Sequence, residues 1–316
     1  HTGLNDVLLS SGGKLQSPQL TVSTSGAPLS LGGDNLASGP ARMGISGGTV
    51  TVRQGASMPA GLQLWLDAST LGLNDGDNLT TWADSSGKGH NADGRVSDPS
   101  YVAFSTHGRP AVYFDGDDEL NTSFNFDSDQ YTILSVARYT SSGDSDGNSR
   151  RVIDSATRNW LFGFHGALDE RFYAEGWIST TGSDNTNWHI HAGTMTNDAD
   201  PLANFWKEGN LLVANSTGSS NTNYRIGRLR LGGSGGENSR AEISEILIFD
   251  HVLSAAEMNN VGGYLAAKYA LPTSYTGNFD PQNVYLPTTN INVSGSATLH
   301  ADTLGIDLTK GPKYAG

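Results

Sequence analysis

Two short stretches of the sequence carry side chains whose spacing could support chemistry. Glu242 and Glu245 are three residues apart, and retaining glycoside hydrolysis needs two carboxylates about 5–5.5 Å apart. His189 and His191 are two residues apart, a spacing that places both imidazoles on one face of a β-strand, where they could bind a metal ion. Both pairs therefore depend on the strands that would hold them.

The period of a β-strand argues against catalysis by the two glutamates. Successive side chains of a regular strand alternate between its faces, so Glu242 and Glu245 are expected on opposite sides. The residue that would share a face with Glu242 is Ser244, which is not a carboxylate. We therefore predict no catalytic residues and a protein that is not an enzyme. The sequence suggests no third ligand near the histidines, which favours a solvated or hydrogen-bonded pair over a metal site.

Aromatic residues are better candidates for ligand binding. Sugars stack their apolar faces on indole rings while neighbouring polar groups bind the hydroxyls. Trp160, Trp177 and Trp188 lie among Asn, Thr, Asp and His residues, and we predict that they form a glycan-binding face with His189. The other tryptophans fall within patterned strands and are expected in the core: Trp65, Trp82 and Trp206.

One oxygen-rich loop could hold calcium. Asp144, Asp146 and Asn148 follow Gly143 and reproduce the opening of a calcium-binding loop, but the closing glutamate of that loop is missing. These three residues are the candidate calcium ligands, and an ordinary polar turn is the alternative. No other cofactor is expected.

Composition narrows the class of protein. The chain has 316 residues, 40 of them glycine, no cysteine and a formal net charge of −13. So many weak helix formers favour short strands joined by turns, and the negative charge would repel a nucleic acid. No apolar run approaches the ~20 residues of a membrane-spanning helix. Abundant Ser, Thr, Asn and Gly, with a start at His1, lead us to expect a processed piece of a bacterial extracellular or cell-surface protein.

The stretch from residue 242 to 271 predicts a strand followed by a helix. Residues 243–249 form a short apolar run rich in β-branched and aromatic side chains, which indicates a strand. Ser254 and Glu257 have the spacing of a capping box, which indicates where the helix begins. Pro272 closes the helix.

Short strands with frequent turn signals fill most of the remaining chain. This pattern predicts an all-β fold, an antiparallel jelly-roll sandwich with one short C-terminal helix. The terminal segments differ from the middle because they are rich in glycine and short of large apolar residues. We predict β-strand segments at 1–60 and 273–316, on either side of a sandwich at 61–272.

Four motifs of the central segment carry a resemblance to a known family. They are LWLD at 64–67, WADSSGKG at 82–89, PAVYFDG at 110–116 and the strand and helix of 242–269. Together they resemble a bacterial laminin-G-like domain of the concanavalin A-like superfamily. The resemblance implies two curved antiparallel sheets, one of them concave, with loops at the rim. It also favours a calcium ion at the rim, without fixing the ligands of that ion. It leaves function open, because this fold hosts lectins, adhesion modules, pentraxins and glycosidases.

Two interpretations of function follow. The flanks resemble repeats of large autotransporter-type exported proteins, and strands that cannot bury a face alone offer edges to a partner. The first interpretation is a non-catalytic structural or adhesion protein whose terminal β segments pair with neighbouring copies into a fibre or surface layer. The second is a carbohydrate-binding module of a surface glycan receptor or a polysaccharide-degrading enzyme, whose partner is a glycan.

Overall fold

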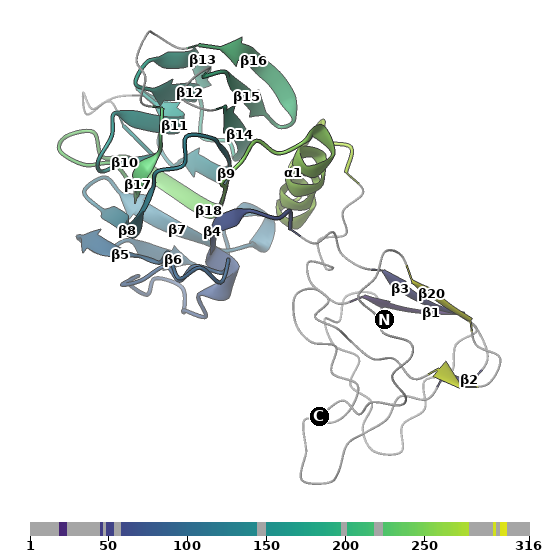
Figure 1. Cartoon of the computed structure of the whole chain (residues 1–316). Coiled ribbons are helices and arrows are strands. Elements are labelled where there is room, and N and C mark those ends of the chain that lie inside the picture. Colours follow the sequence, from purple (N-terminus) through teal and green to yellow (C-terminus); the bar gives the residue numbers. More distant parts are fainter. Residues whose placement is uncertain are drawn as a thin grey trace. The chain divides into compact units, whose positions relative to one another are not determined.

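The computed structural model describes residues 58–143, 150–196, 201–217 and 224–277, together with short strands in the flanking parts of the chain. The chain divides into two compact units: Pro59–Gly277, and His1–Met58 with Asn278–Gly316. The first unit is a β-sandwich with an α-helix on one side, as Figure 1 shows. The antiparallel all-β fold that the turn pattern predicts is therefore confirmed.

One sheet of the sandwich carries the helix and is called the helix-bearing sheet. Its strand order is β16-β15-β14-β9-β18-β7-β6, and β4 pairs with β18 beyond the end of β7. Its strands are β4 (Leu62–Asp67), β6 (Ser100–Val102), β7 (Ala111–Asp115), β9 (Tyr131–Tyr139), β14 (His189–Met195), β15 (Ala203–Lys207), β16 (Asn210–Ser216) and β18 (Arg240–Phe249). Two short 3-10 turns, η2 (Ala68–Thr70) and η3 (Thr106–Gly108), follow β4 and β6.

The opposite sheet has the order β13-β12-β11-β10-β17-β8-β5. Its strands are β5 (Ala92–Val96), β8 (Glu119–Phe126), β10 (Ile153–Ser155), β11 (Trp160–His165), β12 (Leu168–Ala174), β13 (Trp177–Asp184) and β17 (Gly227–Leu231). Strands β10 to β13 follow one another as a meander, whereas β17 lies between β8 and β10 and so requires a crossover. All the ladders described in the two sheets are antiparallel.

Aromatic side chains fill the space between the sheets. Phe162 and Phe172 of the opposite sheet meet Phe205 of the helix-bearing sheet with ring centroids 5.7 and 5.9 Å away. Trp160 is fully buried beside them, and its indole N–H donates to the hydroxyl of Tyr131 (2.9 Å). A buried indole with a satisfied N–H is a core residue. Trp160 therefore offers no ring face to a sugar, and its predicted place in a glycan site is wrong for this structure.

Strand β18 is buried on both faces because a helix covers the outer one. Its side chains at Ile246 and Ile248 enter the sandwich core, while Leu247 and Phe249 on the other face are also fully or almost fully buried. The helix α1 (Ala255–Tyr269) begins at the predicted capping box, since Ser254 and Glu257 exchange hydrogen bonds. The sequence of a strand that is covered on both faces is a continuous apolar run, whereas a strand with one exposed face alternates apolar and polar residues.

A buried polar cluster joins α1 to the helix-bearing sheet. The ammonium of Lys268 donates to Asp67 Oδ2 (2.6 Å) and Glu245 Oε2 (2.7 Å), and is 8% exposed. Glu245 also accepts from the indole of Trp65 (2.6 Å) and from the hydroxyl of Tyr269 (2.7 Å). Burial acts to lower the pKa of Lys268, but the two carboxylates outweigh burial and raise that pKa above the ordinary lysine value. The cluster therefore keeps its cation in the folded state.

The flanking parts of the chain pair with each other. β1 (Gln19–Ser23), β3 (Thr49–Arg53) and β20 (Thr298–Ala301) form a three-stranded parallel sheet, and β2 (Ile45–Ser46) pairs with β19 (Val293–Ser294). Strands from the N-terminal and C-terminal flanks thus lie in one unit. Their pairing with neighbouring copies stays a prediction.

Replacing Lys268 with methionine tests the polar cluster. The variant leaves Asp67 and Glu245 buried without their cation, and breaking a buried ion pair in this way costs about 3–5 kcal/mol. We expect a loss of that order in the free energy of unfolding of Lys268→Met, measured by urea denaturation. The matched control is Lys88→Met at an exposed loop position. Equal stability of the two variants would show that the cluster contributes little.

Candidate functional site

A cavity of about 720 Å³ opens beside the C-terminal end of α1. Its wall combines one indole with charged, amide and hydroxyl side chains. The charged and aromatic residues are His107, Arg138, Trp188, His189 and Glu208. The remaining lining residues are Thr186, Asn187, Asn210, Leu271, Pro272, Thr273 and Ser274. A single aromatic surface surrounded by hydrogen-bonding groups is the composition expected of a sugar site.

A two-residue turn between β15 and β16 forms one side of the cavity. Lys207 pairs with Asn210 across it, and the turn residues Glu208 and Gly209 both have positive φ (48° and 81°), as a type I′ hairpin requires. A Cβ on Gly209 would lie 2.7 Å from the backbone nitrogen of Tyr275, so glycine also allows the close approach of the chain that follows α1. Strands β15 and β16 therefore form a tight β-hairpin.

The segment after Pro272 is tied to this turn. The backbone N–H of Ser274 donates to the carbonyl of Glu208 (2.7 Å), and the Ser274 hydroxyl donates to Asn210 Oδ1 (2.9 Å). The ring of Tyr275 lies against Gly262 of α1, where a Cβ would come within 2.4 Å of it. The position of α1 therefore fixes the segment after Pro272, which closes one side of the cavity.

Trp188 supplies the aromatic surface of the cavity. It lies just before β14 and is partly exposed, with the guanidinium carbon of Arg138 located 5.2 Å from its ring centroid. Arg138 is held in turn by Glu242, whose Oε2 accepts from Nε (3.0 Å) and Nη2 (3.0 Å). The cation–π contact and the ion pair together fix the orientation of the indole.

His189 lies behind Trp188 in a chain of charged groups. Its Nδ1 is 2.7 Å from Glu208 Oε1, and its Nε2 is 2.9 Å from Asp169 Oδ2 on β12 of the opposite sheet. Lys207 donates to the same Asp169 oxygen (2.7 Å) and to Glu170 (2.9 Å). The network thus joins the two sheets at the edge of the cavity.

The charges of this network support one another. Burial acts to lower the pKa of His189, but its hydrogen bonds to Asp169 and Glu208 outweigh burial and raise that pKa. Burial acts to raise the pKa of Asp169, yet hydrogen bonds from His189 and Lys207 hold it far below the usual range. We conclude that the structure favours an imidazolium at His189.

His191 shares a strand face with His189, as the spacing predicts, with ring centroids 5.6 Å apart. It is fully buried and stacks on Phe205 with ring centroids 5.4 Å apart. Burial, followed by the charge at His189, holds the pKa of His191 well below the ordinary value. Both nitrogens of His189 already contact carboxylates, which argues against a metal site. The expected hydrogen bonding holds for His189 alone, because neither ring nitrogen of His191 has a hydrogen-bond partner among the described residues.

The structure separates the predicted glycan-binding residues. Trp188 and His189 line the cavity together, whereas Trp160 lies in the core. Trp177 is 38% exposed on β13, where it packs against Tyr173 (ring centroids 5.1 Å apart). Trp177 does not line the cavity of Trp188.

Several lining residues carried no functional signal in the sequence. Arg138 ends a strong strand pattern, and Glu208 and Asn210 mark only a turn. Pro272 indicates the end of a helix. Each is a signal of local structure, and only the packing of β9, the hairpin and the chain after α1 brings these residues together.

Glu242 and Glu245 lie on the same face of β18, so the prediction of opposite faces is wrong. The register of β18 against β9 shifts between Ile243 and Glu245, which makes Ser244 the extra residue of a β-bulge. Ile243 and Ile246 both enter the core, and the two glutamates both point outward. Glu242 is bound by Arg138 and Glu245 by Lys268, so both carboxylates serve in structural ion pairs.

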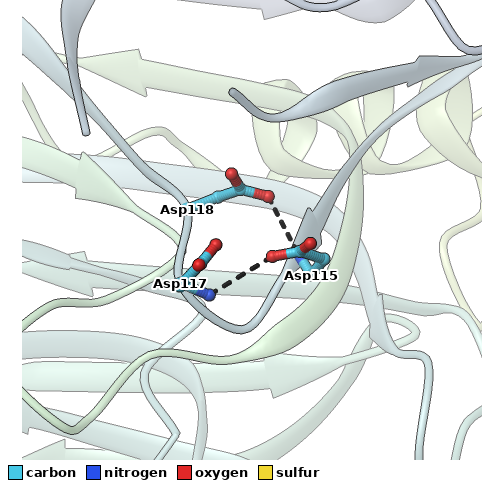
Figure 2. Close-up of side chains that lie close together, drawn as sticks. All are labelled: Asp115, Asp117 and Asp118. Carbon is cyan, nitrogen blue, oxygen red and sulfur yellow. Dashed lines mark hydrogen bonds between the residues drawn. The ribbon is translucent and has the colours of Figure 1, made fainter. Parts of the chain in front are cut away.

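Three aspartates gather at the turn after β7. Ligand oxygens of Asp115, Asp117 and Asp118 all lie within 4.8 Å of one another. Figure 2 shows the backbone N–H of Asp115 donating to Asp118 (2.9 Å) and that of Asp117 donating to Asp115 (3.3 Å). Carboxylate oxygens are the ligands that calcium takes, so this turn has the donor chemistry for a hard cation.

The predicted calcium ligands Asp144, Asp146 and Asn148 lie outside the described residues. Their role stays a prediction. In the part of the chain that the structure describes, no helix is both long and apolar enough to cross a membrane.

The sequence matches no protein-family model and no curated protein. The resemblance to laminin-G-like domains therefore stays a prediction from the sequence motifs.

Several solved structures are similar at low identity. Trypanosoma rangeli sialidase in complex with sialic acid is 14% identical, with a TM-score of 0.46 over 66% of this chain and 33% of the sialidase. Domain 4 of a GH43 extracellular arabinanase from Geobacillus stearothermophilus, in complex with arabinotriose, is 12% identical, with a TM-score of 0.45 over 64% of this chain and 98% of that domain.

The binding domain of botulinum neurotoxin DC in complex with SialylT is 15% identical, with a TM-score of 0.45 over 66% of this chain and 52% of that chain. The chain spans about a third of the length of the sialidase. Similarity at this level concerns the β-sheet fold alone.

The His189 network predicts a pH-dependent stability. Because the folded-state pKa of His189 is raised, its contribution is fully present below the ordinary histidine value of about 6.5 and is lost as pH rises through the folded pKa. We expect the stability difference between the wild type and His189→Gln to shrink as pH rises from 6 to 9. Urea denaturation across this range checks it, and a pH-independent difference would contradict it.

The raised pKa of Asp118 predicts that the stability of the protein depends on pH. Burial, followed by the charges of Asp115 and Asp117, raises the pKa of Asp118 to about 6 from 3.8. The folded state therefore binds more protons than the unfolded state between these values, and stability falls as pH rises through them. We expect the stability of Asp118→Asn relative to the wild type to increase as pH rises from 4 to 6. Above pH 6 this difference in stability should stay constant. Thermal melts at each pH provide the measurement.

Proposed function

We propose that the sandwich is a non-catalytic carbohydrate-binding domain of an extracellular or cell-surface protein, with its glycan site at the Trp188 cavity. The observation that carries this proposal is the partly exposed indole of Trp188 in a cavity of about 720 Å³, whose other lining residues are mainly of polar types. Pockets for small ligands typically have volumes of ~300–1,000 Å³. The size suits one or a few sugar residues.

The lining groups match the chemistry of a sugar. Asn187, Asn210 and Thr186 can each donate and accept hydrogen bonds, as vicinal hydroxyls require. Trp188 provides an apolar surface for the C–H face of a pyranose or furanose ring. Leu271 and Pro272 add apolar contact without flexible side-chain ends. A ligand with alternating hydroxyl and C–H surfaces uses all of these groups.

The ordered walls favour binding without a large rearrangement. Trp188 is held by Arg138, and the 208–210 turn is bonded to Ser274. Groups that are already fixed lose little conformational freedom when a ligand binds. A preformed site therefore supports recognition of a weakly binding ligand such as an oligosaccharide.

Replacing Trp188 with alanine tests the proposed site. A glycan array of purified wild-type protein identifies bound sugars, and calorimetry then measures their affinity. We expect Trp188→Ala to weaken binding about tenfold or more, which corresponds to about 1.4 kcal/mol. The matched control is Trp177→Ala, because Trp177 is also partly exposed but lies outside the cavity.

The control should bind sugars as the wild type does. If Trp177→Ala lost glycan binding and Trp188→Ala kept it, the glycan site would lie at β13 instead. A wild type that binds no glycan on the array would overturn the proposal.

A further inference from the structure

The charges around the Trp188 cavity are compensated within the protein. The guanidinium of Arg138 holds Glu242 through Nε and Nη2, both at 3.0 Å. The hydroxyl of Ser105 also donates to the same carboxylate oxygen. Glu242 is 7% exposed and does not line the cavity, so it neutralises Arg138 from behind.

The second basic group of the cavity is compensated in the same way. His189 contacts Glu208 through Nδ1 (2.7 Å) and Asp169 through Nε2 (2.9 Å). The Lys207 ammonium faces the same network and is shared between Asp169 and Glu170. The imidazolium therefore has no N–H directed at a ligand in the cavity.

An anionic ligand would meet an unfavourable field here. A carboxylate that leaves water needs a charged or strongly donating partner at close range. At this site it would have to compete with Glu242 or Glu208 for a cation, and both of those carboxylates are already at hydrogen-bond distance. The net charge of −13 adds a long-range repulsion. Hydroxyl groups of a neutral sugar meet neither penalty.

We propose that the Trp188 cavity selects neutral glycans and discriminates against sugars that carry a carboxylate, such as sialic and uronic acids. This inference rests on the proposed glycan-binding function and specifies its ligand class. The selectivity comes from Glu242 and Glu208, which neutralise the cations of the site.

Lactose and sialyllactose form a matched pair of probes, since they differ by one acidic sugar. Arabinotriose and trigalacturonic acid provide a second comparison of neutral and acidic oligosaccharides. Titration of the wild type by NMR at pH 8, above the range in which exposed imidazoles ordinarily titrate, gives an affinity for each probe. We expect at least one neutral probe to bind about tenfold more tightly than either acidic probe.

Glu242→Gln reduces the preference for neutral probes if the inference is correct. Glutamine keeps an acceptor for Arg138 and Ser105 but removes the negative charge, so the guanidinium becomes available to an anion. We expect the affinity for sialyllactose or trigalacturonic acid to rise about fivefold or more, with little change for neutral probes. Glu175→Gln, which removes one negative charge outside the cavity, is the matched control.

The outcomes separate this inference from the function on which it rests. Acidic probes that bind the wild type as tightly as neutral ones, with binding lost in Trp188→Ala, overturn the selectivity and leave the glycan site in place. Binding of no probe, or binding that Trp188→Ala does not weaken, overturns both. The wild-type comparison is decisive even if Glu242→Gln does not fold.

Discussion

The buried contact between Lys268 and the carboxylates of Asp67 and Glu245 is the constraint on which the candidate site depends. It joins the last turn of α1 to two strands of the helix-bearing sheet. A buried ion pair is costly to form and more costly to break, so its geometry tolerates little movement. Hydrogen bonds from Trp65, Tyr264 and Tyr269 occupy further lone pairs of Glu245. The position of the helix follows from this cluster.

The cavity beside the helix is a consequence of that position. Once α1 is fixed, the chain after Pro272 passes over Gly262 and reaches the 208–210 turn, where Ser274 bonds to Glu208 and Asn210. Glu208 in turn contacts His189, and His189 reaches Asp169 on the opposite sheet. A continuous set of polar contacts therefore runs from Ser274, in the segment after the helix, to the opposite sheet along one wall of the cavity.

A β-bulge in β18 explains why the outer face of this strand holds two charged residues that are both buried. The bulge at Ser244 turns Glu242 and Glu245 to one side of the sheet. Glu245 anchors the helix, whereas Glu242 anchors Arg138 beneath Trp188. Two carboxylates that look like a catalytic pair in the sequence thus serve one structural and one electrostatic role. The charge at Glu242 is also what would set the preference for neutral ligands.

The sequence by itself determined the elements whose signals are local. The capping box at Ser254, the end of the helix before Pro272 and the hairpin at Glu208–Asn210 all depend on residues within a few positions of one another. The frequent turn signals between short strands likewise predicted an antiparallel sandwich. Only the tertiary structure decided where Trp160 and Trp188 lie, because the packing of the two sheets encloses Trp160 of β11 in the core and leaves Trp188, just before β14, at the wall of the cavity. It also decided the side of Glu245, since one inserted residue reverses the period of a strand. The cavity itself joins residues from 107 to 274, and no spacing in the sequence encodes contacts at that range.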